Sequence, residues 1–196
     1  MKRLITIASV ATLLVGAASA HAAEGPKGGL GFRSRAIPVA TLAQAPFNAV
    51  PSLGGRHWMN DQFGIDLGLG FDQAKFEPAP EQKFTAFVVD VGVPISLKKV
   101  SDKVNFIFRP GFQWSSLEDK LDATSSSPAS TIKTTAFAVS GELEVEFMVT
   151  EYLSVSASHG IHYLQAENDL NPKDKLTSFG SDEGNFTQLG FHVYLW

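Results

Sequence analysis

The sequence contains no cysteine, few long apolar runs and no excess of basic residues. Without cysteine the chain forms no disulfide and offers no thiolate for catalysis or for zinc binding. Its longest apolar run, Leu4–Gly16, is shorter than the roughly 20 residues that a transmembrane helix needs. Acidic residues outnumber basic ones by 20 to 16, so binding to nucleic acid has no electrostatic support.

The first residues are nevertheless informative. Two basic residues precede the apolar run, and small residues lead up to Ala22 and Ala23. This order is typical of a Sec signal peptide. We expect residues 1–23 to be removed on export and residues 24–196 to form one domain with a formal net charge of −6, from 14 basic and 20 acidic residues.

Apolar residues alternate with small or polar ones in four long segments. The clearest is Phe63–Asp72, in which the odd positions are Phe, Ile or Leu and the even positions are Gly or Asp. The same alternation occurs in Ala86–Leu97, Asn105–Ser115 and Ala136–Phe147. A period of two residues is typical of β-strands with one apolar face.

Four weaker segments bring the expected number of strands to eight. They are Gly28–Ile37, Val50–Asn60, Leu153–Gln165 and Phe186–Trp196. The last one is apolar on both faces, so its alternation does not show which side faces inward.

The expected connections alternate between short and long. The short ones are Asn60–Gln62, Lys98–Lys103 and Val149–Tyr152, and the long ones are Pro38–Ala49, Gln73–Lys83, Leu117–Lys133 and Ala166–Asn185. Short inner turns and long outer loops are typical of a transmembrane barrel with both termini in the periplasm. The sequence therefore predicts an all-β fold, an eight-stranded antiparallel up-and-down transmembrane β-barrel.

The size of the side chains indicates which face is outside. The polar face carries Gly, Ala, Ser and charged residues, while the apolar face carries bulky Phe, Val, Ile and Leu. The interior of an eight-stranded barrel is just wide enough for side chains to fill, so we expect the bulky face to contact lipid. A soluble ligand-binding barrel with the opposite facing stays as the alternative fold.

The Trp and Tyr residues fall near expected strand ends, where amphipathic rings favour a membrane interface. The periplasmic group is Trp58, Tyr152, Tyr194 and Trp196, and the outer group is Trp114 and Tyr163.

The signal peptide, the chain length, the eight-strand rhythm and the ending Tyr194-Leu195-Trp196 resemble the small outer-membrane barrels of the OmpA/OmpX/OmpW kind. This resemblance implies location in a Gram-negative outer membrane. It also implies that Tyr194 and Trp196 form an assembly signal read by the barrel assembly machinery, with periplasmic chaperones as further partners during biogenesis. We expect contact with outer-membrane lipids and lipopolysaccharide, a monomeric state, and no cofactor or metal.

If the facing is right, charged residues gather in the lumen, where a charge is tolerated only when it is paired. The expected ion-pair network contains Arg33, Arg35, Arg56, Asp66, Asp72, Asp90, Arg109, Glu142, Glu144 and Glu146. Arg109 is the expected partner of the three glutamates.

These residues favour a structural, surface-contact or envelope-integrity role without catalysis. A narrow channel for small or apolar solutes is a second hypothesis. A third is a lipid-modifying enzyme that uses His159, which we expect on the lipid face. His162 lies three residues further on, so the two imidazoles should point to opposite faces and not share a metal.

Overall fold

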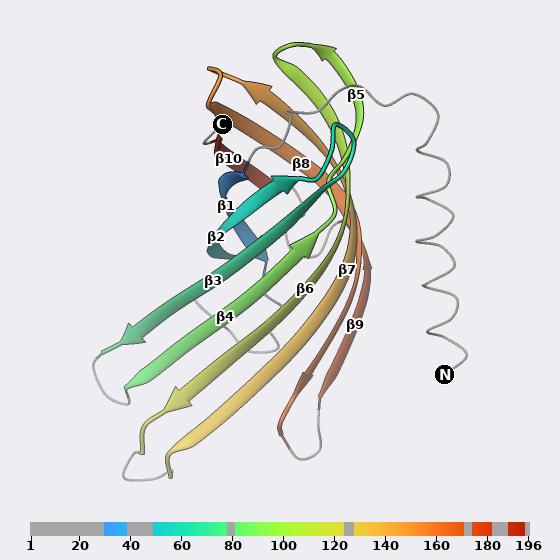
Figure 1. Ribbon diagram of the computed structural model, residues 1–196. Helices are drawn as coiled ribbons and strands as arrows, with labels where there is room; N and C mark the ends of the chain where they lie inside the picture. The colour runs from blue at the N-terminus through green and yellow to red at the C-terminus, as the bar shows by residue number, and fades with distance from the viewer. Residues whose placement is uncertain are drawn as a thin grey trace.

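The computed structural model describes residues 30–38, 49–77, 81–123, 128–170, 174–181 and 188–194, with side chains from residue 50 onward (Figure 1). The described residues contain ten strands: β1 (Leu30–Pro38), β2 (Ala49–Trp58), β3 (Gly64–Phe76), β4 (Gln82–Gly92), β5 (Ile95–Ser101), β6 (Val104–Leu121), β7 (Ser130–Met148), β8 (Leu153–Asn168), β9 (Lys175–Gly180) and β10 (Gln188–Tyr194). No helix in this described part is long and apolar enough to cross a membrane.

All the strand pairs are antiparallel, and they form a closed ring. The order is β1-β2-β3-β4-β6-β7-β8-β10, and β10 then pairs with β1. Closure matters because hydrocarbon offers no partner to an unpaired backbone group. The all-β antiparallel barrel is therefore confirmed.

Two positions in the ring are each occupied by two short strands. β4 and β5 follow one another along β6, and the break between them falls at Pro94, which has no backbone N–H to donate. β9 and β10 likewise both pair with β8, at Glu167–His162 and at Ser158–Leu153. The ten described strands thus make eight positions, as the sequence predicts.

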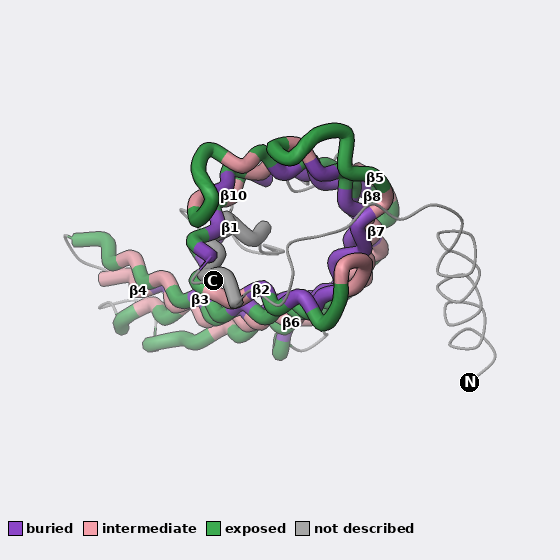
Figure 2. Tube along the Cα trace, turned by 45° about the horizontal axis from the view of Figure 1, so that its top comes forward, coloured by how far each residue is buried: buried purple, intermediate pink, exposed green. Residues whose placement is uncertain are grey.

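The predicted facing is confirmed on the clearest strand, β3. Asp66 is fully buried, whereas Leu67 and Leu69 are each 52% exposed and Phe71 is 61% exposed. The same alternation continues around the ring (Figure 2). Polar residues inside and apolar residues outside are the reverse of a soluble ligand-binding barrel, so that alternative is wrong.

The facing of the last strand, which the sequence left open, is settled by the structure. Leu189, Phe191 and Val193 are exposed on the outer surface, and His192 and Tyr194 are buried. Tyr194 and Trp58 therefore lie in the lumen, not in a periplasmic girdle. That part of the aromatic prediction is wrong, because a residue near a strand end can face either way.

Trp114 and Tyr163 lie on the outward face of the barrel, but not at strand ends as predicted, since β6 continues seven residues beyond Trp114 and β8 five residues beyond Tyr163. The rings of Trp114 and Phe87 pack edge to face, with 6.1 Å between their centroids. Tyr163 lies opposite Phe179 on the neighbouring strand β9. Tyr152 is exposed near the opposite end of the barrel, and Trp196 lies outside the described residues.

Two of the three predicted short turns are confirmed, and polar side chains close both. The third, Lys98–Lys103, is wrong for most of its length, because β5 continues to Ser101 and only Asp102 and Lys103 form the turn. The Asn60 carboxamide accepts hydrogen bonds from the backbone N–H groups of Gln62 and Phe63, both at 2.8 Å. The Thr150 hydroxyl accepts from Tyr152 and Leu153 in the same way. Side-chain caps of this kind satisfy turn amides that have no strand partner.

Three of the four predicted long loops are too long, because strands continue into them, and the fourth, Pro38–Ala49, lies almost entirely outside the described residues. β3 and β4 stay paired as far as Phe76 and Gln82, and β6 and β7 as far as Leu121 and Ser130. The expected loop Ala166–Asn185 contains β9. These segments lose their apolar face but keep the two-residue alternation, so loss of apolarity marks the edge of the membrane and not the end of the strand.

Substituting an arginine for Leu69 should destabilise the barrel by about 2–4 kcal/mol, because the charge would enter hydrocarbon. The free energy of unfolding can be measured by urea titration in phospholipid vesicles. Gln73→Arg is the matched control, since Gln73 is also exposed on β3 but lies beyond the apolar residues. Equal effects at both positions would contradict the lipid-facing assignment.

Candidate functional site

The candidate site is a layer of charged side chains inside the barrel. Its members project inward from β2, β3, β4, β6 and β7, and the alternation that exposes Leu67 and Leu69 buries them. Backbone register sets Arg56 opposite Asp66 and Arg109 opposite Glu142, so pairs form between adjacent strands.

Arg56 donates hydrogen bonds to carboxylates on two sides. Its Nε and Nη2 donate to the two oxygens of Asp66 at 2.8 and 2.9 Å. Its Nη1 and Nη2 donate to the two oxygens of Glu144 at 2.8 and 3.0 Å. Such two-point pairs fix the plane of the guanidinium as well as its position. Glu144 is on β7, so this arginine ties distant parts of the ring together.

Arg109 makes a second set of contacts that shares Asp66. Its Nε donates to Asp66 at 2.7 Å, its Nη2 to Asp90 at 2.7 Å, and its Nη1 to Glu142 at 3.0 Å. Asp66 therefore bridges both arginines, and the whole layer is one connected network.

A glycine on the neighbouring strand makes room for Arg109. A Cβ placed on Gly92 would lie 2.4 Å from Cζ of Arg109. Any larger residue would displace the buried guanidinium. A glycine inside a strand signals a close approach of this kind, but the sequence does not say which group approaches.

Glu146 anchors a second cluster that the sequence did not predict. Its Oε1 accepts from the Ser154 hydroxyl at 2.7 Å and from the Tyr194 hydroxyl at 2.6 Å, and it lies 3.1 Å from Nδ1 of His192. Its other oxygen is 3.9 Å from Arg56. The alternation along β10 would have placed His192 and Tyr194 inside the barrel. It could not be read from the sequence because both faces of this segment are largely apolar.

This cluster joins a serine, an imidazole and a carboxylate, but its geometry is not that of a catalytic triad. Ser154 and Glu146 both contact Nδ1 of His192, whereas a triad places serine and acid on different ring nitrogens. All three side chains are also buried. His159, the residue of the enzyme hypothesis, lies exposed on the outer face of β8.

Three residues of the predicted network are not part of the layer as described: Asp72 lies elsewhere, and the side chains of Arg33 and Arg35 are not described. Asp72 is half-exposed near the outer end of β3, and its carboxylate accepts from the backbone N–H of Gln73. Asp72 is six residues beyond Asp66 on the same strand, which places it too far away to join the layer. The side chains of Arg33 and Arg35 lie outside the described residues, although the β1 backbone sets Arg33 opposite His192 and Gly54.

Apolar residues lie on both sides of the charged layer. Toward the outer end are Val50, Ala86, Val88 and Leu117, and toward the periplasmic end are Trp58, Ile107 and Tyr194. The guanidinium of Arg56 also stacks over Trp58, with Cζ 5.8 Å from the ring centroid. Apolar side chains therefore border the ion pairs on both sides.

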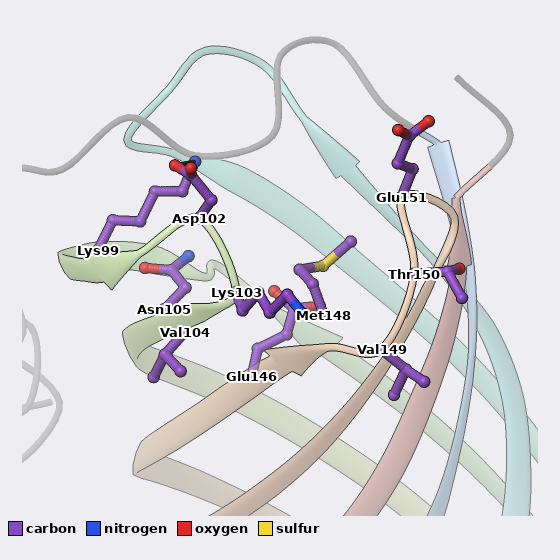
Figure 3. Close-up of a pocket in the computed structure, with 10 residues that line it drawn as sticks. All are labelled: Lys99, Asp102, Lys103, Val104, Asn105, Glu146, Met148, Val149, Thr150 and Glu151. Carbon is purple, nitrogen blue, oxygen red and sulfur yellow. Dashed lines mark ion pairs between the residues drawn. The ribbon is translucent and has the colours of Figure 1, made fainter.

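A cavity of about 520 Å³ opens at the periplasmic mouth, between the turns that follow β5 and β7 (Figure 3). Lys99 and Lys103 lie at its rim, and Asn105, Glu146 and Met148 line its wall. Met148 packs against the cluster of Trp58, Ile107 and Tyr194. That cluster and the charged layer therefore stand between this cavity and the outer half of the lumen. The described side chains include no group of three or more candidate metal ligands.

Comparison with known proteins identifies the family. The sequence matches the model of the outer membrane protein beta-barrel domain over residues 7–193. The chain belongs to this family.

The structure of a major outer membrane protein from Thermus thermophilus is similar to this beta-barrel domain. The TM-score is 0.53 and the identity 10%, over 85% of this chain and 98% of that one. Ail of Yersinia pestis matches with a TM-score of 0.47 and 12% identity, over 87% of this chain and 100% of the other. No curated protein matches the sequence.

The family assignment establishes the location and general nature of the molecule. It is an integral β-barrel of the bacterial outer membrane. The exposed apolar band and the closed ring of strands are the physical basis for that location.

Asp66→Asn should destabilise the barrel by about 3–5 kcal/mol, because two buried arginines would lose a shared counter-charge. Urea titration of the folded barrel in vesicles measures this loss. Asp72→Asn removes the same charge from the same strand outside the layer and should change stability by less than about 0.5 kcal/mol. Similar losses for both variants would show that the layer does not hold the barrel together.

Proposed function

We propose that this protein is a non-conducting outer-membrane anchor that presents a rigid β-sheet at the cell surface. The observation that carries the proposal is the combination of a filled lumen with strands much longer than the membrane requires.

The filled lumen argues against a solute path. Arg56 and Arg109 are fully buried and bound to carboxylates from β3, β4 and β7. Opening a pore would separate these ion pairs in a low-dielectric interior, and breaking one buried pair alone costs about 3–5 kcal/mol. The apolar groups on both sides of the layer oppose hydration as well.

The strand lengths support the surface role. β6 and β7 contain 18 and 19 residues, whereas about 9–11 tilted residues span a bilayer. Beyond the apolar band, β3, β4, β6, β7, β8 and β9 remain hydrogen-bonded to one another. Their outer ends run together past β1 and β2 (Figure 1).

Side-chain contacts stiffen the outer sheet. Lys75 pairs with Glu77 at 2.6 Å and with Glu81 at 2.9 Å across the β3–β4 turn. The ammonium lowers the pKa of Glu77 because it donates a hydrogen bond to the carboxylate. Beside these ion pairs, the rings of Phe76 and Phe84 pack edge to face, with 6.0 Å between their centroids. A sheet held in this way can be presented to a partner with little ordering cost.

The conductance of the barrel in planar bilayers tests the anchor proposal. We expect no discrete current steps, because the network leaves no continuous water path. Current steps that disappear after Arg109→Met, with the barrel still folded, would favour the narrow channel. A difference in gel migration between unboiled and boiled samples shows that the variant is folded.

Hydrogen exchange tests the rigidity of the outer sheet. Amides of β6 from Leu117 to Leu121 and of β7 from Ser130 to Ala136 should exchange slowly, because they are paired across strands. The turn residue Glu151 provides a fast-exchanging reference. If the outer segments exchanged as fast as this turn, the rigid-sheet proposal would be wrong.

A further inference from the structure

A five-residue pattern is repeated at the outer ends of three strands. Lys83-Phe-Thr-Ala-Phe87 is on β4, Lys133-Thr-Thr-Ala-Phe137 on β7, and Lys175-Leu-Thr-Ser-Phe179 on β9. In each copy the lysine, the threonine and the last phenylalanine alternate with residues that face inward, so all three lie on the outer surface.

The three copies have the same direction, with the lysine toward the outer end of its strand. Each phenylalanine is the outermost aromatic residue on the outward face of its strand. Four residues of tilted strand then raise the lysine about 9 Å above that ring. Phosphate and sugar groups of the outer leaflet lie at this depth, and a flexible lysine can reach down to them.

Two copies line the same hollow. A surface depression of about 470 Å³ lies over β7, β8 and β9. Its lining includes Lys133, Thr135 and Phe137 from one copy and Lys175 and Thr177 from another. Register places Thr135 opposite Glu167 and Glu167 opposite Lys175, so β8 supplies the floor between the two copies.

The hollow contains both hydrogen-bond donors and hydrogen-bond acceptors. Lys133, Lys175 and the two threonines can donate hydrogen bonds, while Glu167 and Asp169 accept them. Glu167 also lies 3.1 Å from the ammonium of Lys175, and Asp169 accepts from the backbone N–H of Lys133 at 2.8 Å. Opposite charges balance here, which suits a ligand with both anionic groups and hydroxyls better than a bare anion.

We infer that this hollow binds the phosphorylated sugar headgroup of an outer-leaflet glycolipid, lipopolysaccharide. The lysines and threonines bind phosphate, and the carboxylates accept from sugar hydroxyls. Phe137 and Phe179, which is 74% exposed, contact the acyl chains below. The third copy, on β4, has Lys75 and Lys120 opposite its lysine and no second copy beside it.

Lipid binding to the folded barrel in zwitterionic detergent tests this inference, with native mass spectrometry as the readout. The titrants are rough lipopolysaccharide, the same lipid after enzymatic dephosphorylation, and phosphatidylglycerol. We expect the first to bind and the other two to bind at least about tenfold more weakly. The dephosphorylated lipid loses the charge-assisted contacts to phosphate, and phosphatidylglycerol lacks the sugar hydroxyls that the carboxylates accept from. Equal binding of all three would overturn the inference.

Variants locate the site. Lys133→Ala/Lys175→Ala should weaken lipopolysaccharide binding about tenfold. Lys98→Ala/Lys103→Ala removes the same charge from exposed positions on β5 and in the periplasmic turn after it, and should leave binding within about twofold of the parent. Equal losses from both pairs, or no loss from the first, would contradict the assignment. Thr135→Val/Thr177→Val keeps all charges and should also weaken binding, which separates a built site from general electrostatic attraction.

Discussion

Asp66 lies between two arginines in the middle of the barrel, and much of the structure depends on that arrangement. Its two oxygens accept from Arg56 and Arg109, which in turn hold Glu144, Asp90 and Glu142. A charge at this depth is stable only with partners in good geometry. The strands that carry these partners must therefore keep one register and one inward face, and the bulky apolar residues are forced to the outside.

The outside of the barrel follows from the same constraint. Because the lumen takes the charged and small residues, the outer surface is left with Phe, Leu, Ile and Val, which only hydrocarbon accommodates. Closure of the ring then satisfies the backbone. Above the apolar band the constraint from lipid ends, yet the pairing between β6 and β7 continues. The resulting outer sheet and its repeated Lys-x-Thr-x-Phe pattern are where we place contact with the environment and with lipid headgroups.

The sequence predicted what depends on alternation and missed what depends on register. The facing of Asp66 and Leu67 could be read because the two-residue period is unbroken there. The facing of Trp58 and Tyr194 could not, because nearness to a strand end does not fix a face. The sequence predicts loops at the outer ends of β6 and β7 because the outward residues there are Glu, Lys and Thr. The cluster of Ser154, His192 and Glu146 joins three strands, and no local pattern specifies such a contact.

Solid-state NMR of the labelled protein in lipid bilayers would test the central contact most directly. Guanidinium carbons of Arg56 and Arg109 should both show through-space correlations to the Asp66 carboxylate, and the guanidinium protons should exchange slowly with water. If neither arginine correlates with Asp66 and both exchange rapidly, the lumen is hydrated and the account of a closed, ion-paired barrel is wrong.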